Sequence, residues 1–295
     1  MRRTRDWVTP TSYAGDMNRR VFLGTLPVAA AAQSGAVARH GRLKQCVTRG
    51  VFNRSMTFEE TCREAARLGC QGYDLIGPEN WPTLKKYGLI PTMYPPGAGG
   101  TIPDALNRKE NHAPLEKSIG AAIDQCAAAG APNVITFSGN RRGMADAEGA
   151  DNCVAFLNRV KAHAEDQGVT ICMELLNSKV NHKDYMCDHS AWGVEVMRRV
   201  NSPRVKLLYD IYHMQIMEGD ICRTIRENFQ WIAHFHTGGN PGRHEIDDTQ
   251  ELNYRFIAKT IADLGFTGYI AHEYSAAPGR DALKSLHQAL EICDV

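Results

Sequence analysis

The sequence predicts an α/β fold, a single-domain (β/α)8 TIM barrel, and three observations favour it. After residue 42, short apolar or β-branched segments alternate eight times with amphipathic helical segments. No linker rich in proline, glycine or serine divides this part of the chain. The 257 residues from 39 to 295 (295 − 38) also suit such a barrel, which typically needs roughly 250.

The predicted strands are the apolar and β-branched segments 43–48, 72–76, 89–94, 133–138, 169–176, 205–211, 232–237 and 268–274. The predicted helices lie between and after them, at 57–68, 80–87, 115–129, 146–167, 189–200, 220–228, 251–264 and 281–293. Thr57 and Glu60 have the spacing of a capping box at the start of the first helix. Four helices are followed by a glycine that can end them: Gly69, Gly130, Gly168 and Gly265.

A doubly wound parallel sheet is the alternative architecture for alternating strands and helices. Such a sheet usually carries a G-x-G-x-x-G turn after its first strand, where it binds the phosphates of a dinucleotide. No such turn follows segment 43–48. The barrel is therefore the preferred prediction.

The N-terminal segment has the pattern of an export signal. Arg19 and Arg20 precede a short apolar run, and Ala36-Val37-Ala38 is typical of a cleavage site. We therefore expect residues 1–38 to be an N-terminal extension with a twin-arginine (Tat-type) signal, and residues 39–295 to be the barrel domain. A frayed alanine-rich helix is the alternative. Export would place the protein in the periplasm, and an unused signal would leave it in the cytoplasm.

Composition argues against several classes of partner. The 34 Lys and Arg residues nearly balance the 33 Asp and Glu residues, with no basic stripe, which argues against a nucleic-acid partner. No apolar run reaches the roughly 18 residues that a membrane span needs, so no membrane partner is expected. The nine cysteines form no C-x-x-C pair, so neither a disulfide framework nor a zinc ribbon is predicted, and we expect the thiols to be buried.

Four residues that can bind a metal follow the last four predicted strands. They are Glu174, Asp210, His236 and Glu273. The carboxyl ends of barrel strands form the active site, so these side chains are expected to converge there. A buried carboxylate is costly unless it is paired or binds a cation. Three carboxylates and an imidazole suit a divalent metal ion, Mg²⁺ or Mn²⁺.

Other polar residues near these strand ends have expected roles as well. His213 lies three residues after Asp210, where it can face a substrate, and Arg243 lies in a loop where its guanidinium can bind a carboxylate or phosphate. We expect His234 to point to the opposite side of its strand from His236. His272 is expected to be structural.

Three motifs resemble one branch of a known family. They are DIYHMQIMEGD at 210–220, NPGRHE at 240–245 and ELNY at 251–254. In these stretches the chain is similar to the hydroxypyruvate isomerases of the xylose isomerase-like TIM barrels. That superfamily also includes ketose 3-epimerases and endonuclease-IV-type enzymes. The similarity extends over residues 43–293 and is weaker in the first half.

The resemblance implies a reaction and assigns roles to the site residues. Glu174, Asp210, His236 and Glu273 would hold the divalent metal, and Glu174 and Glu273 would transfer protons. His213 and Arg243 would contact the substrate. The implied reaction interconverts hydroxypyruvate and 2-hydroxy-3-oxopropanoate (tartronate semialdehyde) through an enediolate. The implied partner is a small hydroxy-keto acid or sugar, and relatives are commonly homo-oligomers.

Three alternatives share parts of this pattern. A ketose 3-epimerase or 3-keto-sugar isomerase or lyase would use the same carboxylates, and histidine is usual in sugar epimerases at the position of His236. A nuclease of the endonuclease IV type would need further metal ligands and a basic DNA-binding face, which the sequence lacks. A periplasmic sugar-binding protein would need no pair of strand-end glutamates.

Overall fold

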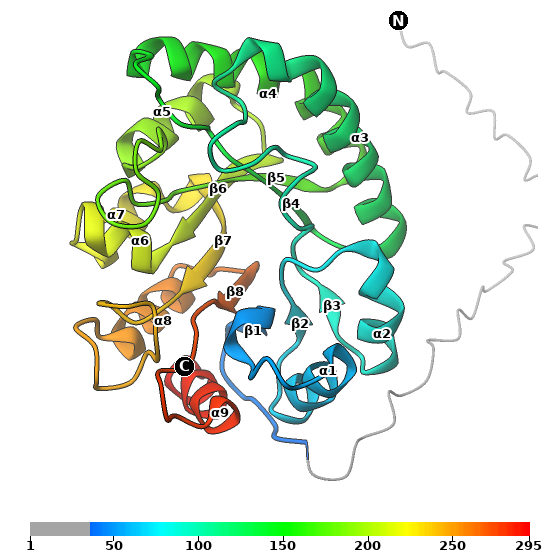
Figure 1. Cartoon of the computed structure of the whole chain (residues 1–295), viewed down its shortest axis with the longest axis vertical. Coiled ribbons are helices and arrows are strands. Elements are labelled where there is room, and N and C mark those ends of the chain that lie inside the picture. Colours follow the sequence, from blue (N-terminus) through cyan, green and yellow to red (C-terminus); the bar gives the residue numbers. More distant parts are fainter. Residues whose placement is uncertain (1–35) are drawn as a thin grey trace, which may run out of the picture. The chain divides into compact units, whose positions relative to one another are not determined.

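Eight parallel strands curl into a barrel in the computed structural model, which describes residues 36–295 (Figure 1). The strands pair in the order β3-β2-β1-β8-β7-β6-β5-β4. Their bounds are β1 (Lys44–Val47), β2 (Gly72–Tyr73), β3 (Ile90–Pro91), β4 (Asn133–Thr136), β5 (Thr170–Glu174), β6 (Val205–Asp210), β7 (Ile232–Thr237) and β8 (Tyr269–His272). The predicted fold class is confirmed.

The barrel closes between β3 and β4 through a single bridge rather than a ladder. Tyr94 pairs in parallel with Val134, and the Tyr94 amide donates to the Asn133 carbonyl oxygen at 2.8 Å. The Asn133 side-chain amide reinforces this seam by donating to the Thr92 carbonyl oxygen at 2.9 Å. A side-chain hydrogen bond thus contributes to closure where the strands themselves pair least.

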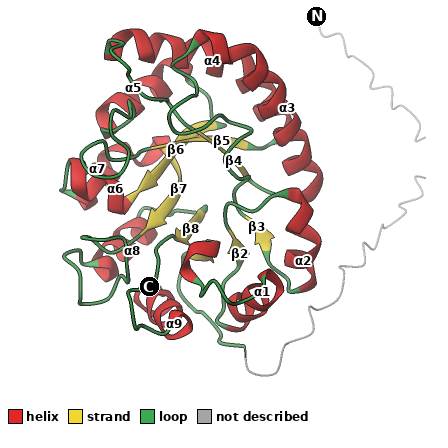
Figure 2. Ribbon diagram, in the orientation of Figure 1, coloured by secondary structure: helices red, strands yellow, loops and turns green. Residues whose placement is uncertain are grey.

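Helices surround the strands in the arrangement expected of a (β/α)8 barrel (Figure 2). They are α1 (Phe58–Arg67), α2 (Trp81–Lys86), α3 (His112–Ala129), α4 (Asp146–Gln167), α5 (Ser190–Val200), α6 (Ile211–Met217), α7 (Ile221–Asn228), α8 (Tyr254–Asp263) and α9 (Ala282–Ile292). The predicted capping box of α1 is present, because Thr57 and Glu60 each bond to the other's backbone amide. The glycine after α4, Gly168, adopts the left-handed conformation with φ at 70°.

One helix was not predicted from the sequence, because no change in hydropathy marks its start. Helix α6 follows β6 directly, and its residues continue the apolar run of that strand. Asp210 starts the helix, because its side chain accepts a hydrogen bond from the His213 amide at 3.0 Å. This short helix fixes His213 beside the end of β6.

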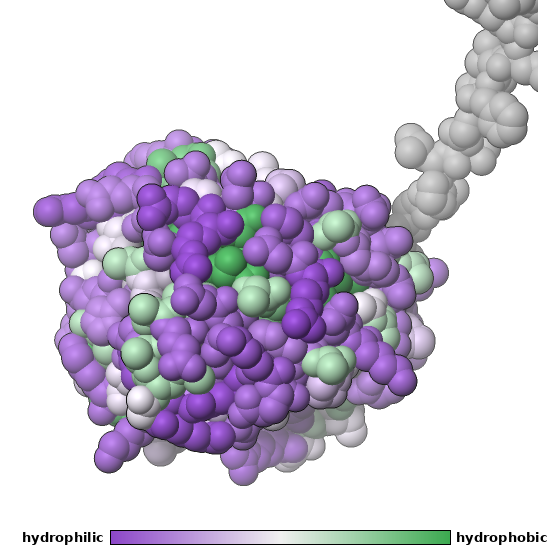
Figure 3. Space-filling view, turned by 90° about the horizontal axis from the view of Figure 1, so that it is seen from above, coloured by the Kyte–Doolittle hydropathy of each residue, from purple (hydrophilic) through white to green (hydrophobic). Residues whose placement is uncertain are grey.

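The face of the molecule drawn in Figure 3 is largely polar. Hydrophilic side chains cover most of the face in Figure 3, and apolar ones are scattered among them. All nine cysteines are free and eight are buried, as expected of small apolar residues. Among residues 36–295, no helix is long and apolar enough to cross a membrane.

The predicted export signal falls mostly on residues 1–35, which lie outside the described part of the chain. Its last positions are described. The Val37 amide donates to the Arg67 carbonyl oxygen at the end of α1, at 2.8 Å. The signal and its cleavage after Ala38 stay predictions.

Candidate active site

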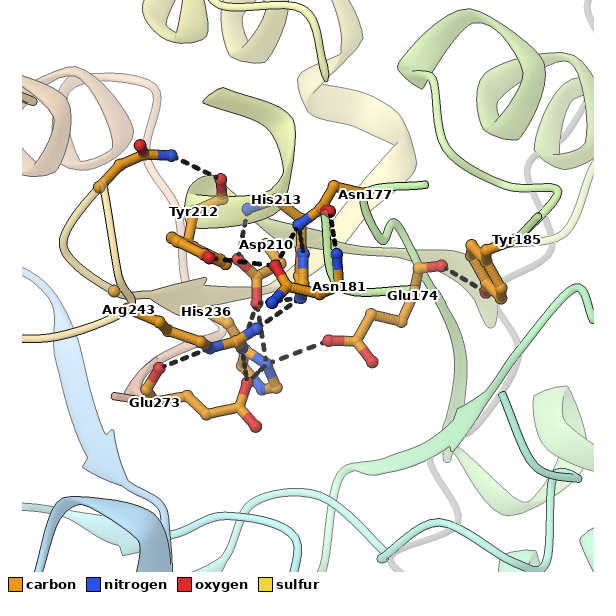
Figure 4. Close-up of polar contacts among 12 residues, drawn as sticks. Glu174, Asn177, Asn181, Tyr185, Asp210, Tyr212, His213, His236, Arg243 and Glu273 are labelled. Carbon is orange, nitrogen blue, oxygen red and sulfur yellow. Dashed lines mark hydrogen bonds and ion pairs between the residues drawn. The ribbon is translucent and has the colours of Figure 1, made fainter. Parts of the chain in front are cut away.

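Four side chains meet at the carboxyl end of the barrel. Glu174 ends β5, Asp210 ends β6, His236 lies near the end of β7, and Glu273 directly follows β8. One ligand atom of each lies within 4.8 Å of the corresponding atoms of the other three (Figure 4). Strand register supports this meeting, because Asp210 pairs with His236 across β6 and β7. The structure therefore brings together all four predicted metal ligands.

His236 lies at the centre of this group. Its Nδ1 atom is 2.6 Å from Glu273 Oε2, 3.4 Å from Glu174 Oε1 and 3.8 Å from Asp210 Oδ2. Its other ring nitrogen, Nε2, lies 2.9 Å from Asp74 Oδ2. A carboxylate at one imidazole nitrogen fixes the proton there and leaves the other nitrogen free to bind a metal, which is common for histidine ligands.

The donor set fits a hard divalent cation. His236 Nδ1 is buried and makes no well-directed hydrogen bond, although three carboxylates surround it. Glu174 and Asp210 are buried at 6% and 0% exposure, where uncompensated negative charge is costly. Oxygen donors with one imidazole are the ligands that Mg²⁺ and Mn²⁺ prefer. The four residues could therefore hold such an ion.

Arg243 lies against the same carboxylates. Its Nη2 atom is 2.6 Å from Asp210 Oδ2 and 2.5 Å from Glu273 Oε2, and its Nε donates to the Glu273 carbonyl oxygen at 3.1 Å. Its backbone adopts a left-handed φ of 56°, and its guanidinium stacks 5.1 Å from the centre of the Tyr212 ring. The loop after β7 thus directs a fixed positive charge into the site.

His213 completes the polar lining that the sequence predicts. Its ring Nε2 lies 2.5 Å from Arg243 Nη1, and its Nδ1 lies 2.5 Å from the side-chain nitrogen of Asn177. Burial and the neighbouring Arg243 charge hold the pKa of His213 well below its usual range. The ring is therefore neutral at physiological pH and can act in hydrogen bonding but not as a cation.

The two glutamates titrate differently. Burial raises the pKa of Glu174 to about 7, against the opposing effect of His236. Burial also opposes ionisation of Glu273, but the charges of Arg243 and His236 outweigh it and lower the pKa of that carboxyl. Two carboxyl groups with separated pKa values are typical of sites where one group accepts a proton and another donates one.

The prediction for His234 is wrong. His234 and His236 both lie on the inner side of β7 and both approach Asp74, at 3.3 Å and 2.9 Å. The physical reason is that side chains alternate along a strand with a period of two, so residues two apart share a face. His272 is structural as expected, since its ring nitrogens lie 3.0 Å from Thr237 Oγ1 and from Gln45 Oε1.

Asp74 is the site residue that sequence reasoning missed. It is fully buried, follows β2 directly, and holds Nε2 of His236. The available signal was the one used for the later strands, a carboxylate directly after an apolar segment. Tyr212 and Asn177, which contact Arg243 and His213, had no comparable signal.

A cavity of about 500 Å³ opens beside this group. Glu273 and Arg243 line it together with Asp74, and a second arginine, Arg49, lines it from the loop after β1. The volume lies in the usual range for small-molecule sites. A substrate entering here would meet Arg243 and the carboxyl group of Glu273, whereas the Arg49 guanidinium donates to the Asn53 and Met56 carbonyl oxygens.

Comparison with known proteins gives a consistent result. The family model for the xylose isomerase-like TIM barrel matches residues 62–293. A putative hydroxypyruvate isomerase from Xenopus laevis is 32% identical over 120 residues, which are 40% of this chain and 43% of that protein. A 2-oxo-tetronate isomerase from Haemophilus influenzae is 26% identical over 238 residues, which are 76% of this chain and 90% of that protein. The match to the Xenopus relative thus spans less than half of its length.

Solved structures show the same fold. An AP endonuclease of family 2 from Brucella melitensis superimposes with a TM-score of 0.74 at 24% identity, over 83% of this chain and 96% of that one. A D-psicose 3-epimerase superimposes with a TM-score of 0.68 at 18% identity, over 85% of this chain and 96% of that one. At these identities the structural similarity shows the barrel architecture alone.

Proposed function

The chain belongs to the xylose isomerase-like TIM barrel family, and on that premise we propose that it is a metal-dependent isomerase. The proposed reaction converts hydroxypyruvate into 2-hydroxy-3-oxopropanoate by proton transfer through an enediolate. The observation that carries the proposal is the meeting of Glu174, Asp210, His236 and Glu273 within 4.8 Å. Relatives named hydroxypyruvate isomerase and 2-oxo-tetronate isomerase support this class of reaction.

The chemistry requires two proton positions on neighbouring carbons. One glutamate removes a proton from C3 of hydroxypyruvate, and a glutamic acid returns a proton to C2, while the hydroxyl proton moves from the C3 oxygen to the C2 oxygen. Glu174 and Glu273 approach His236 from opposite sides in Figure 4, which suits this exchange. General acid–base assistance of this kind typically contributes 10²–10⁴-fold.

A divalent cation held by the four residues would stabilise the negative charge that develops on the two substrate oxygens. The protein's own part is to fix the donors in advance. Asp74 holds the ring of His236, and Arg243 holds Asp210 and Glu273. Carboxyl groups held in this way need little reorganisation when the proton moves.

Arg243 favours an acidic substrate. It lines the cavity, and a guanidinium binds a carboxylate through paired hydrogen bonds. A neutral ketose offers no group that needs such charge. Substitution Arg243→Lys keeps the charge but removes the fork, so we expect kcat/KM for hydroxypyruvate to fall about 10²-fold, mainly through KM.

A substrate panel tests the proposal. The purified protein would be incubated in D₂O with hydroxypyruvate, D-psicose or a 3-keto-D-glucoside, with Mg²⁺ or Mn²⁺ and after chelation. We expect conversion of hydroxypyruvate with deuterium at C2 of the product, and loss of conversion after chelation. Turnover of the sugars alone would replace the proposal with an epimerase. No conversion of any of these substrates with either metal ion would end the isomerase proposal.

The second candidate is therefore a ketose 3-epimerase or 3-keto-sugar enzyme, which the histidine at position 236 favours. Binding of the metal ion can be followed separately from turnover, by electron paramagnetic resonance of Mn²⁺.

We also propose periplasmic export, supported by Arg19 and Arg20 before the apolar run. Fractionation of cells that produce the full chain would test it. The double substitution Arg19→Lys with Arg20→Lys keeps both positive charges but removes the arginine pair, so it should retain the protein in the cytoplasm. Wild-type protein found only in the cytoplasm would contradict export.

A further inference from the structure

A second group of potential metal ligands lies deeper in the barrel. Cys46 on β1, Asp74 after β2 and His234 on β7 each place one donor atom within 4.8 Å of the other two. All three residues have 0% exposure. No residue of this group belongs to the four that end β5 to β8, and the proposed isomerase reaction uses none of its donor atoms directly.

His234 is the unusual member of the group. Neither of its ring nitrogens makes a hydrogen bond, although the ring is fully buried. Its nearest polar partner is Asp74 Oδ1, 3.3 Å from Nε2 and poorly directed. Leaving a buried polar group unsatisfied destabilises the folded state. His272 on the next strand shows the usual solution, with a partner at each nitrogen.

The neighbours of the group use only part of the bonding capacity of its donor atoms. Asp74 Oδ1 accepts from Thr92 Oγ1 at 2.5 Å, and Asp74 Oδ2 lies 2.9 Å from His236 Nε2. Cys46 Sγ donates a hydrogen bond to the Ile270 carbonyl oxygen at 3.5 Å, which a metal-bound thiolate would give up. Within residues 36–295, the ion pairs of Asp74 are with His234 and His236 and with no lysine or arginine.

We propose that Cys46, Asp74 and His234 form a second metal site, which takes a borderline-soft divalent cation such as Zn²⁺. A thiolate, an imidazole and a carboxylate are typical zinc ligands, whereas a soft thiolate does not suit Mg²⁺. The deep site (Cys46, Asp74 and His234) therefore selects a different ion from the outer site (Glu174, Asp210, His236 and Glu273). This proposal goes beyond the isomerase function and does not depend on it.

The required rearrangement is small. Bonds of about 2.3 Å from zinc to sulfur and about 2.0 Å to nitrogen place tetrahedral donors roughly 3.3–3.8 Å apart. Donor atoms that now lie within 4.8 Å of one another need movements of about 1 Å, which side-chain rotation can supply. Because Asp74 also holds His236, a cation in the deep site would share with the outer site the carboxylate that orients that ring.

The experiment uses the full chain, stripped of metal by chelation and then saturated with Mg²⁺. Co²⁺ is added as the spectroscopic probe for Zn²⁺, and bound metal is counted after equilibrium dialysis. We expect a tightly bound Co²⁺ that gives a thiolate-to-cobalt charge-transfer band in the near ultraviolet and is displaced by Zn²⁺, beside any Co²⁺ that replaces Mg²⁺ at Glu174, Asp210, His236 and Glu273. Wild-type protein that binds Co²⁺ without this band, or binds none beside Mg²⁺, would overturn the proposal.

Variants then identify the ligands. Cys46→Ala and His234→Gln should each remove the band and lower the count by one equivalent. Cys153→Ala is the matched control, because Cys153 is an equally buried thiol on α4, and it should keep the band. A band that persists in Cys46→Ala contradicts the assignment, and the wild-type spectrum decides even where a variant fails to fold.

The substitution Asp210→Asn distinguishes metal binding at the outer site from metal binding at the deep site. This change should weaken binding of Mn²⁺ and leave the cobalt–thiolate band unchanged. Failure of the isomerase proposal would appear as absent turnover with the band intact. Failure of the deep site would appear as turnover without the band, so the two proposals can be judged independently.

Discussion

The two halves of the barrel differ in what their strand ends do. The ends of strands β5 to β8 each place one potential metal ligand at a common point. Three of these four side chains are carboxylates, so the group has an excess of negative charge. In the half from β1 to β4, polar side chains such as Ser138 and Asn133 form hydrogen bonds with backbone groups. Ser138, just after β4, accepts from the Cys187 amide at 2.9 Å, and Asn133 bonds the Thr92 carbonyl.

This difference teaches where chemistry and stability are located. Hydrogen-bonded polar groups stabilise the first half. The second half brings carboxylates of like charge together, and a bound cation would relieve their repulsion. Asp74 is the exception, because it belongs to the first half but supports His236 of the second. Substitutions in the two halves should therefore separate activity from stability.

The largest effect is expected from Glu174→Gln, in the half formed by β5 to β8. The amide keeps the shape of the side chain but can neither accept the substrate proton nor compensate a cation. We expect kcat to fall about 10³-fold, while the free energy of unfolding stays the same or rises, because a buried like charge is removed. Steady-state kinetics and urea unfolding measure the two quantities.

Glu148→Gln is the matched control for this change, because Glu148 is exposed on α4. It should leave both kcat and the free energy of unfolding within error of the wild type. A normal rate in Glu174→Gln would remove this carboxyl from the chemistry and erase the difference between the two halves.

The next effect is expected from Asn133→Ala, in the half formed by β1 to β4. This substitution removes the hydrogen bond to Thr92 and leaves a buried carbonyl without that donor at the seam between β3 and β4. We expect the free energy of unfolding to fall by about 1–3 kcal/mol, with kcat per folded molecule unchanged. Asn158→Ala, exposed on α4, should change it by less than about 0.5 kcal/mol.

A loss of kcat in folded Asn133→Ala would show that the seam also positions the site. The contrast between halves would then be weaker than the hydrogen bonds suggest. Unfolding curves followed by circular dichroism and activity assays on the same preparation distinguish the two results.

The last effect depends on pH and concerns His272, which shares the sheet with the site but faces away from it. Burial lowers the pKa of His272 to about 3, whereas an unfolded histidine takes up its proton near its ordinary value of 6.5. Between these values the unfolded state binds more protons, so the free energy of unfolding falls as pH falls, by about 1.4 kcal/mol per pH unit.

His272→Gln should remove this contribution and flatten the stability curve between about pH 6 and pH 4. The exposed His40 provides the control substitution, His40→Gln, which should leave the curve unchanged. An unaltered slope in His272→Gln would show that this ring is protonated in the folded protein as well.

Much of the architecture followed from local patterns. Alternating apolar strands and amphipathic helices predicted the barrel, and a carboxylate or histidine at the end of each late strand predicted the four ligands. Helix α6 could not be predicted in the same way, because Ile211 and its neighbours continue the hydropathy of β6. Its start depends on one side-chain hydrogen bond to the Asp210 carboxylate.

The sequence by itself determined which residue types stand at the strand ends, because strand period and helix period are local properties of the chain. Only the tertiary structure decided which of those residues meet. Asp74 and His234 are 160 positions apart, and closing the sheet is what brings them together. The same closure buries Cys46 beside them, where three residues without any shared motif become a candidate metal site.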